Sequence, residues 1–308
     1  MPTLYLSHPC GLNHLVPEGH PERPDRLRAI ERVMEAEAFQ TLLREQAPVV
    51  DLAEIAAAHP EEYIEALEAA APSEGMVRVD ADTAMSPGTW EAVLRAVGAA
   101  VYAVDEVMEG KVKNAFCAMR PPGHHAEKTR AMGFCLFNSA AVAAMHARAK
   151  HGAERVAVID FDVHHGNGTQ DIFWDQKDLF YGSTHQMPLY PGTCATGETG
   201  VGNICNAPLH PGDDGVAFRD AMEVRILPAL EKHNPDLIII SAGFDAHQRD
   251  PLANLNLVEE DYAWVTRKLM DIADKQCEGR VVSVLEGGYD LMGLSLSVAA
   301  HVRALMGS

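Results

Sequence analysis

Basic residues are scarce in this sequence. Its 308 residues include 25 Lys+Arg against 44 Asp+Glu, which gives a formal net charge of −19 at pH 7. This balance argues against a nucleic-acid partner and against an anionic membrane surface, because no basic stripe is available to neutralise phosphate groups. A negative field attracts cations, so a basic small molecule or a lysine-rich peptide is a reasonable ligand class. Solubility explains the charge equally well.

Closely paired cysteines and long apolar runs are also absent. The six cysteines form no CxxC pair, and the first residues resemble neither a basic nor an apolar leader, so we expect a cytoplasmic protein with reduced thiols. No apolar run approaches the roughly 18 residues that a membrane helix needs. Because we find no internal repeat and no linker-like change of composition, we expect one domain over residues 1–308.

The sequence does contain four short, β-rich apolar runs separated by segments of helical character. Continuous apolar runs are typical of strands buried on both faces of a parallel sheet. Residues 87–109 and 138–150 have the spacing of crossover helices, and residues 24–37 predict another amphipathic helix near a proline. We therefore expect an α/β fold with a central, mostly parallel sheet flanked by helices on both faces. The four runs are residues 114–119, 155–161, 237–241 and 281–285.

Each run is followed at once by a cluster of polar residues and glycines. In open parallel sheets, ligands bind outside the carboxyl ends of the strands, so we expect these clusters to converge on one site. The clusters read RPPGHHAEKTRAMGFC from Arg120, DFDVHHGNGT from Asp160, SAGFDAH from Ser241 and EGGYD from Glu286.

Asp160, Asp162 and His164 alternate along the second cluster. A strand period of two predicts that their side chains share one side of the sheet and that His165 points elsewhere. Asp162, His164 and Asp245 would form a three-ligand site of mixed nitrogen and oxygen donors with a position open for water, which is typical of catalytic zinc. For any one of these residues alone, a hydrogen-bonded acidic strand end is the simpler interpretation.

The first and last clusters supply further reactive groups. His124 and His125 follow a stiff Pro-Pro-Gly turn and could be metal ligands or acid and base groups. Consecutive side chains rarely reach one ion, and imidazole suits proton transfer near neutral pH, so we favour acid–base work. Gly287 and Gly288 allow a turn that lets the Tyr289 hydroxyl donate a hydrogen bond to an oxyanion. An isolated EGGY would more often mark a core tyrosine.

Together these motifs resemble those of the histone deacetylase superfamily. The resemblance is to its class II-like branch, which includes bacterial histone deacetylase-like amidohydrolases and acetylpolyamine amidohydrolases, and it runs in the family's order through nearly the whole chain. The other motifs that carry it are HPERPDRL from His20, GFCLFN from Gly133, LYPGT from Leu189, and Asp250 with Pro251 after SAGFDAH.

The resemblance implies a role for each catalytic residue. His125 would be the general base and acid, with His124 as its electrostatic partner oriented by Asp160. Tyr289 would polarise the substrate carbonyl. Asn167 stands where class I relatives carry an aspartate, and an amide lacks the negative charge that would raise the pKa of the second histidine. The implied ligands of the zinc ion (Zn²⁺) are Asp162, His164 and Asp245.

The resemblance also implies a tunnel for an acyl-lysine-like chain, an internal acetate channel and bound K⁺. Arg23 would lie near the acetate channel, and a second K⁺ would lie near Phe173 and Leu179. The first K⁺ site would involve Asp160, Asp162, His164, Ser183 and Thr184. The tunnel would be lined by Gly133, Phe134, Tyr190 and Leu252.

Some residues depart from the family pattern or bear on specificity. Cys194 replaces a common glycine in the PGTCATG loop, and Ser139 replaces a common asparagine after GFCLFN. Leu252 stands where the polyamine-selective eukaryotic branch carries an acidic gatekeeper. Four acidic residues could attract a cation to the rim of the site or form a solvated face: Glu18, Glu22, Asp80 and Asp82. We prefer the solvated face for Asp80 and Asp82.

These observations predict hydrolysis of the acetyl or short acyl amide of acetyl-lysine, an acetylated polyamine or another small amine. Two alternatives stay open, namely a catalytically silent acyl-amine-binding module and a two-manganese ureohydrolase of the related fold. The complete set of ligands, histidines and tyrosine argues against the first. Tandem histidines and EGGY are foreign to the second. Homo-oligomerisation is left open.

Overall fold

Eight parallel strands form the centre of the molecule. The computed structural model describes residues 1–193 and 195–307, so Cys194 lies outside the described residues. The sheet has the order β2-β1-β5-β10-β9-β6-β7-β8, and each neighbouring pair is parallel. The expected α/β fold with a mostly parallel sheet is confirmed. Its strands are β1 (Thr3–Ser7), β2 (Leu43–Gln46), β5 (Asn114–Cys117), β6 (Val156–Asp160), β7 (Leu179–Gln186), β8 (Ile204–Leu209), β9 (Leu237–Ala242) and β10 (Val281–Leu285).

The four strands predicted from apolar runs occupy the four central positions of the sheet. β5, β10, β9 and β6 are adjacent, and all their residues are buried. A strand covered by helices on both faces must be apolar along its whole length, which explains why these runs were recognisable. The flanking strands were not predicted because β2 is mostly exposed and β7 includes several polar residues.

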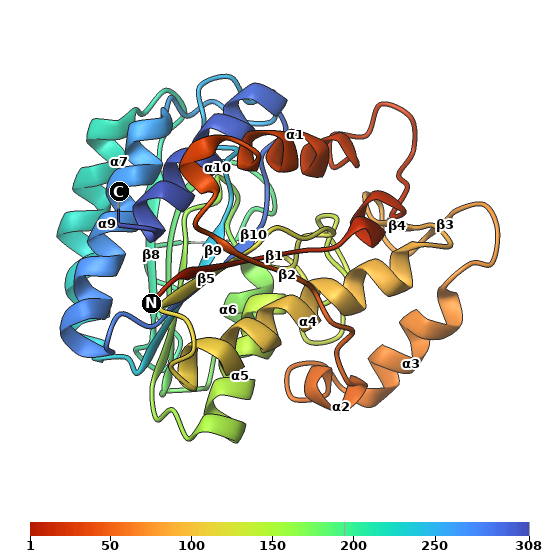
Figure 1. The fold of residues 1–308 in the computed structure, drawn as a ribbon, viewed down its shortest axis with the longest axis horizontal. Helices are drawn as coiled ribbons and strands as arrows, with labels where there is room; N and C mark the ends of the chain where they lie inside the picture. Colours follow the sequence, from red (N-terminus) through yellow and green to blue (C-terminus); the bar gives the residue numbers. More distant parts are fainter. Residues whose placement is uncertain (194, 308) are drawn as a thin grey trace.

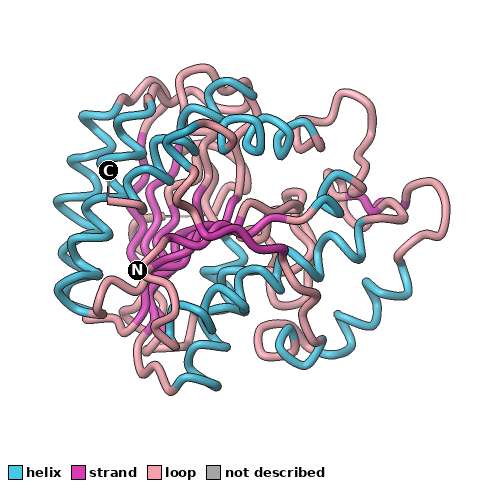
Figure 2. Tube along the Cα trace, viewed as in Figure 1, coloured by secondary structure: helices cyan, strands magenta, loops and turns pink. Residues whose placement is uncertain are grey.

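Helices cover both faces of this sheet. Side chains of α4 and α5 join one core cluster with Val156 and Val158 of β6, whereas α1, α7, α8, α9 and α10 join the other with Ala157 and Ile159. Figure 1 shows α4 and α5 on one side of the strands and α9 and α10 on the other, and Figure 2 shows the strands as a twisted central layer. The alternation of β6 residues between two cores is the strand period of two.

The helices expected at residues 24–37, 87–109 and 138–150 are present as α1, α4 and α5, and Ser139 begins α5. No helix among the described residues is long and apolar enough to cross a membrane. The helices are α1 (Asp25–Met34), α2 (Leu52–Ile55), α3 (Glu61–Ala70), α4 (Thr89–Met108), α5 (Ser139–His151), α6 (Asn167–Phe173), α7 (Gly215–Ala221), α8 (Leu227–His233), α9 (Glu259–Gln276) and α10 (Leu291–Leu305). Short segments complete the fold: η1 (Pro9–Leu12), η2 (Glu37–Phe39), η3 (Met222–Ile226), and the antiparallel pair β3 (Val77–Arg78) and β4 (Ala84–Met85).

One buried histidine joins α9, α10 and β10. Thr266 donates its hydroxyl to the carbonyl of Tyr262, so its oxygen is left to accept from Nδ1 of His301 at 2.6 Å. Nε2 of His301 lies 2.8 Å from the Ser283 hydroxyl, which can donate to it. The neutral ring is therefore fully hydrogen-bonded, and burial lowers the pKa of His301 to about 3.

This contact makes stability depend on pH. The pKa of an unfolded histidine is about 6.5, so acid favours the unfolded chain, and the stabilisation present above about pH 6.5 falls by up to about 1.4 kcal/mol per pH unit as the pH drops toward the folded value. We expect His301→Gln to reduce the slope of unfolding free energy against pH by about one proton between about pH 4 and 6. Urea unfolding at several pH values measures this slope. His210→Gln, at a side chain that is 85% exposed, should keep the wild-type slope, and an unchanged slope for His301→Gln would contradict the assignment.

Candidate metal and catalytic site

The predicted metal ligands do meet at the carboxyl ends of the strands, for a reason other than strand alternation. β6 ends at Asp160, so Asp162 and His164 lie in the following loop. The loop is held by side chains that accept backbone hydrogen bonds two residues on: Asp160 Oδ1 accepts from the N–H of Asp162 at 3.0 Å, and Asp162 Oδ1 from that of His164 at 2.9 Å. Successive turns of this kind, typical of aspartate, aim the side chains. The expectation of a continued strand was wrong.

Asp162, His164 and Asp245 form a buried triad. Nδ1 of His164 lies 3.2 Å from Oδ1 of Asp162 and 3.1 Å from Oδ2 of Asp245. A single N–H can be shared between both oxygens only as a bent, three-centre hydrogen bond. Two ligands of a tetrahedral ion with bonds of about 2.0–2.1 Å lie about 3.3 Å apart, so the spacing of these atoms fits a divalent cation between them.

The pKa shifts of the triad also favour a bound cation. Burial raises the pKa of Asp245, and the charge of Asp162 adds to this, giving about 7. Burial opposes the charged form of His164, but hydrogen bonds to Asp162 and Asp245 outweigh it and raise its pKa to about 10. Burial also opposes the charge of Asp162, yet His124 and His164 hold its pKa below the usual range. A bound cation would relieve the excess of negative charge that these shifts report.

Two glycines allow the backbone to approach the triad. The N–H of Gly287 donates to Oδ2 of Asp162 at 2.8 Å. A Cβ at Gly287 would collide with Oδ2 of Asp245 and come within 2.6 Å of Oδ2 of Asp162, and a Cβ at Gly243 would collide with Asp162. Glycine is therefore required at both positions to let main-chain atoms lie against the carboxylates.

The adjacent histidines have different partners. Nδ1 of His124 lies 2.9 Å from Oδ2 of Asp160, as the resemblance implied. Nδ1 of His125 lies 2.8 Å from Oδ1 of Asn167, whose amide nitrogen donates to Glu127 at 2.8 Å. Since Glu127 fixes the orientation of the amide, Nδ1 of His125 must be the donor. Its Nε2 therefore carries the free lone pair.

Electrostatics separate the two rings further. Burial opposes charge on His124, but Asp160, Asp162 and Glu286 outweigh it, and the pKa of His124 is raised well above its usual range. Burial and then the positive charges of His124 and His164 lower the pKa of His125 well below the usual range. His124 therefore holds a proton more readily than His125, and such a difference between two adjacent groups suits acid–base catalysis at one site.

Tyr289 faces the same space and is held by Asp250 and Arg26, neither of which was predicted to position it. Its N–H donates to Oδ2 of Asp250 at 2.7 Å, and the same carboxylate accepts from the N–H of Leu252 through Oδ1 at 3.0 Å. The guanidinium carbon of Arg26 lies 5.0 Å from the centre of the Tyr289 ring. Asp250 thus positions both the tyrosine and a wall of the cavity.

These groups surround a cavity of about 240 Å³. The structure brings all four predicted tunnel residues to it, and it adds Asp82 and Leu189. The lining residues are Asp82, His125, Gly133, Phe134, His164, Leu189, Tyr190, Leu252 and Tyr289.

Asp82 was predicted to belong to a solvated face, but it is part of the cavity wall. Its Oδ1 accepts from the N–H of Gly133 at 3.0 Å, and Oγ1 of the adjacent Thr83 accepts from the N–H of Phe134 at 3.0 Å. Gly133 and Phe134 both have positive φ, 55° and 70°, a conformation that costs a phenylalanine about 1–3 kcal/mol. The two hydrogen bonds hold this strained turn. In the sequence, only the position of Asp82 beside Thr83 could have indicated this role.

Arg23 does not lie near an internal channel. It is exposed, with Nε 3.6 Å from Asp25. The inward-facing arginine of this segment is Arg26, whose NH1 lies 2.9 Å from Glu22, one helical turn earlier. Glu22 is also paired with Arg120, and all three side chains are fully buried. Both the prediction for Arg23 and a rim position for Glu22 are therefore corrected.

Glu286 ties the first cluster to the last. Its Oε2 accepts from the N–H of Gly123 at 2.7 Å and of His124 at 3.2 Å, and its Oε1 accepts from Ser241 at 3.1 Å. Burial raises the pKa of Glu286 to about 7 although His124 opposes this. The turn that carries the histidine pair is thus fastened to the strand end that carries Tyr289.

The two predicted potassium positions differ. Asp160 and Ser183 are partners in the β6–β7 register, and Oγ1 of Thr184 is buried without a hydrogen-bond partner among the described residues. Such oxygen donors fit a cation at the first position. At the second, Nδ2 of Asn203 already lies 2.8 Å from the carbonyl of Phe173 and 2.7 Å from that of Leu179. Each carbonyl oxygen has a second lone pair, so a K⁺ near Phe173 and Leu179 stays a prediction.

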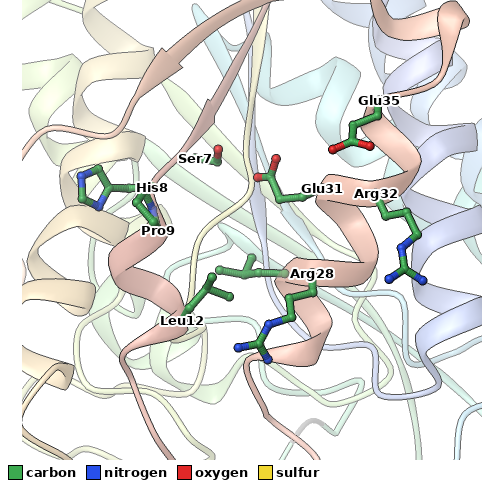
Figure 3. A pocket seen from close by; sticks show the side chains of 9 residues that line it. Ser7, His8, Pro9, Leu12, Arg28, Glu31, Arg32 and Glu35 are labelled. Carbon is green, nitrogen blue, oxygen red and sulfur yellow. The ribbon is translucent and has the colours of Figure 1, made fainter.

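A separate cavity of about 480 Å³ lies between the β1 end and α1 (Figure 3). Arg28 and Arg32 alternate there with Glu31 and Glu35 along α1, so its charges compensate one another. Glu31 is engaged by the hydroxyl of Tyr5 at 2.9 Å. None of the residues that line this cavity belongs to the candidate site.

Known proteins share this arrangement. Residues 20–305 match the model of the histone deacetylase domain. The chain belongs to the histone deacetylase family. It is 39% identical to a histone deacetylase-like amidohydrolase of Pseudomonas aeruginosa over 94% of this chain and 77% of that protein. It is 38% identical to a probable deacetylase of Archaeoglobus fulgidus over 95% of this chain and 83% of that protein. The crystal structure of the HDA15 HD domain superposes with a TM-score of 0.95 at 36% identity, over 100% of this chain and 90% of that one.

The close approach of Gly287 to the triad can be tested in this family member. We expect Gly287→Ala to displace the carboxylates of Asp162 and Asp245 and to lower metal affinity at the triad at least tenfold, because ligand geometry decides affinity. Gly197→Ala, where a Cβ meets nothing within 4 Å, is the matched control. Titration with a fluorescent zinc chelator as competitor measures the affinity. Equal affinities in the two variants would show that the approach is not tight.

Proposed function

We propose that this protein is a zinc-dependent amidohydrolase that removes acetyl or short acyl groups from a primary amine. Residues 1–308 would form one catalytic domain. The observation that carries the proposal is the meeting, in one cavity, of His125 with a free Nε2, the Tyr289 side chain and the candidate metal ligand His164. A binding module needs no such base. Among the described residues, only one triad of candidate ligands contributes a residue to this cavity, namely Asp162, His164 and Asp245, which favours a single-metal enzyme over a two-manganese ureohydrolase.

In this mechanism, Asp162, His164 and Asp245 would hold Zn²⁺, which would supply Lewis-acid chemistry to the amide and to water. Nε2 of His125 takes a proton from the attacking water and later gives it to the departing amine. The His124 cation, held by Asp160, places a positive charge beside the developing negative charge. Tyr289 donates a hydrogen bond to the amide oxygen as it becomes an oxyanion.

The shape of the cavity supports a linear substrate. Phe134 and Tyr190 contribute aromatic walls, and the Phe134 and Tyr289 rings meet edge to face with centres 6.0 Å apart. Apolar walls suit the methylene chain of a lysine or polyamine, whose charged end would remain outside. The acidic Asp82 in the wall suits a substrate with a nearby N–H or cation.

We also propose one structural K⁺ beside Asp160 and a cytoplasmic location. Support for the ion is the unpartnered oxygen of Thr184 on the strand next to Asp160. Support for a reducing compartment comes from the free thiols of the described cysteines, four of which are buried.

The proposed roles predict distinct losses of activity. With zinc-loaded protein and an acetyl-lysine peptide, we expect Tyr289→Phe to lower kcat about 10²–10³-fold by removing an oxyanion donor, and His125→Ala to lower it about 10²–10⁴-fold by removing the base. Tyr102 lies on α4, away from the cavity, and Tyr102→Phe, which removes a hydroxyl that donates to Glu45 of β2, should retain full activity. Steady-state release of acetate measures turnover. If both site variants matched the wild type, or if the wild type hydrolysed no acylated amine, the enzymatic proposal would fail.

Leu252 offers a test of substrate class. A carboxylate at this wall position would attract the distal ammonium of a polyamine, so Leu252→Glu should raise the ratio of kcat/KM for acetylspermidine to that for an acetyl-lysine peptide roughly tenfold, or about 1.4 kcal/mol. Leu252→Gln has the same shape without the charge and should leave the ratio close to that of the wild type. A ratio that moves equally in both variants would assign the effect to size rather than charge.

A further inference from the structure

A second cluster of metal-ligand side chains lies on the helices rather than at the catalytic cavity. It consists of Asp105 of α4 with His146 and His151 of α5, whose ligand atoms lie within 4.8 Å of one another. Nε2 of His146 is 2.8 Å and Nε2 of His151 is 2.6 Å from the same oxygen, Oδ1 of Asp105. The side chain of His146 is 1% exposed. Two imidazoles therefore converge on one carboxylate oxygen at a largely buried place.

This cluster is distant from the deacetylase site. Asp105 lies in the last turn of α4, shortly before β5 begins, and His151 is the last residue of α5, shortly before β6 begins. The ends of these helices therefore face the amino edge of the parallel sheet, whereas the catalytic loops leave its carboxyl edge. No residue is shared between the two groups.

Carboxylates face both nitrogens of His146, which favours positive charge there, either on the ring or on a bound metal ion. Its Nδ1 lies 2.7 Å from Oε2 of Glu54 on α2, while its Nε2 faces Asp105. A neutral imidazole carries one N–H, so it would direct its other lone pair at a carboxylate. Each nitrogen therefore requires a proton, or a metal ion must lie between Nε2 and Asp105.

We propose that Asp105, His146 and His151 bind a divalent transition-metal cation, with Zn²⁺ as the probe, at a site independent of the catalytic centre. The donors are two imidazole Nε2 atoms and one carboxylate oxygen, a set that suits zinc and leaves a fourth position for water. Glu54 accepts the remaining N–H of His146, which is the usual carboxylate–histidine–metal arrangement. The ion would clamp α4 to α5 and, through Glu54, to α2.

Only small movements are needed to admit the ion. The present N···O distances of 2.6 and 2.8 Å would have to open to about 3.3 Å around an ion with bonds of about 2.0–2.1 Å. Asp105 need not turn, because its other oxygen, Oδ2, is 3.2 Å from Nζ of Lys150. This lysine is 54% exposed and is not a ligand. Because imidazole ligands must be neutral to bind a metal ion, affinity should fall in acid.

Metal stoichiometry of the full chain tests the proposal. After equilibrium dialysis in buffered Zn²⁺, elemental analysis should find two ions per wild-type chain. His151→Gln should retain one ion, and His164→Ala, which removes a catalytic ligand, should also retain one. Failure of the deacetylase proposal would appear in turnover and would leave the ion at Asp105 unaffected.

Two milder variants guard against misfolding. Glu54→Gln keeps all three ligands and should weaken zinc at this site about 10–100-fold. Lys150→Ala removes the neighbouring charge and should keep both ions. The wild-type thermal midpoint should rise on zinc addition more than that of His151→Gln. Equal zinc content and equal thermal shifts in wild type and His151→Gln would overturn the proposal and leave a hydrogen-bonded ionic cluster.

Discussion

Buried negative charge at the carboxyl edge of one parallel sheet is the constraint on which the site depends. Asp160, Asp162, Asp245 and Glu286 are all fully or almost fully buried there. Isolated carboxylates in such a place would cost several kcal/mol each. The chain offsets this with backbone N–H donors, from Val163 to Asp245 for example, with the His124 cation and with a gap suited to a metal ion. Metal binding at the triad would therefore be linked to folding.

The same constraint explains the glycines. A backbone N–H can reach a buried carboxylate only if its own residue and the neighbouring ones lie against the oxygen atoms. Gly243 and Gly287 do so where any side chain would overlap the triad. Gly133 plays a matching part beside His125, where a Cβ would come within 2.6 Å of the ring carbon Cγ. The glycine-rich strand ends are thus a consequence of packing charge against main chain.

The sequence predicted those parts of the fold that short stretches of sequence determine. The four central strands were recognisable because burial on both faces demands unbroken apolar runs. β1 escaped notice although it is largely buried, because Thr3, Tyr5 and Ser7 interrupt its apolar run. β7 escaped because its LFYGSTHQ sequence buries polar side chains that find partners only in the folded sheet, as Ser183 does with His185 at 2.9 Å.

The site was predicted by type and order of residues, and long-range contacts explain what was missed. Asp250 and Glu286 act by accepting backbone hydrogen bonds from segments about 40 and 160 residues away, which no local pattern reveals. Arg23 and Arg26 are three residues apart, and only the register of α1 against Glu22 determines which one is buried. Helix periodicity alone does not show whether Arg23, just before Pro24, or Arg26, two residues after it, is buried.

Histidine between carboxylates occurs at both edges of the sheet, and spacing decides what each place can hold. At the catalytic edge, one nitrogen of His164 faces two oxygens at 3.1 and 3.2 Å, so the two oxygens must share the single proton on that nitrogen. At the other edge, each nitrogen of His146 faces its own oxygen at 2.7 or 2.8 Å, so two protons serve as well as an ion. A metal ion at Asp105 must compete with two well-placed protons, whereas one at Asp162 replaces a single shared proton. The catalytic edge should therefore hold its ion more tightly and over a wider range of pH.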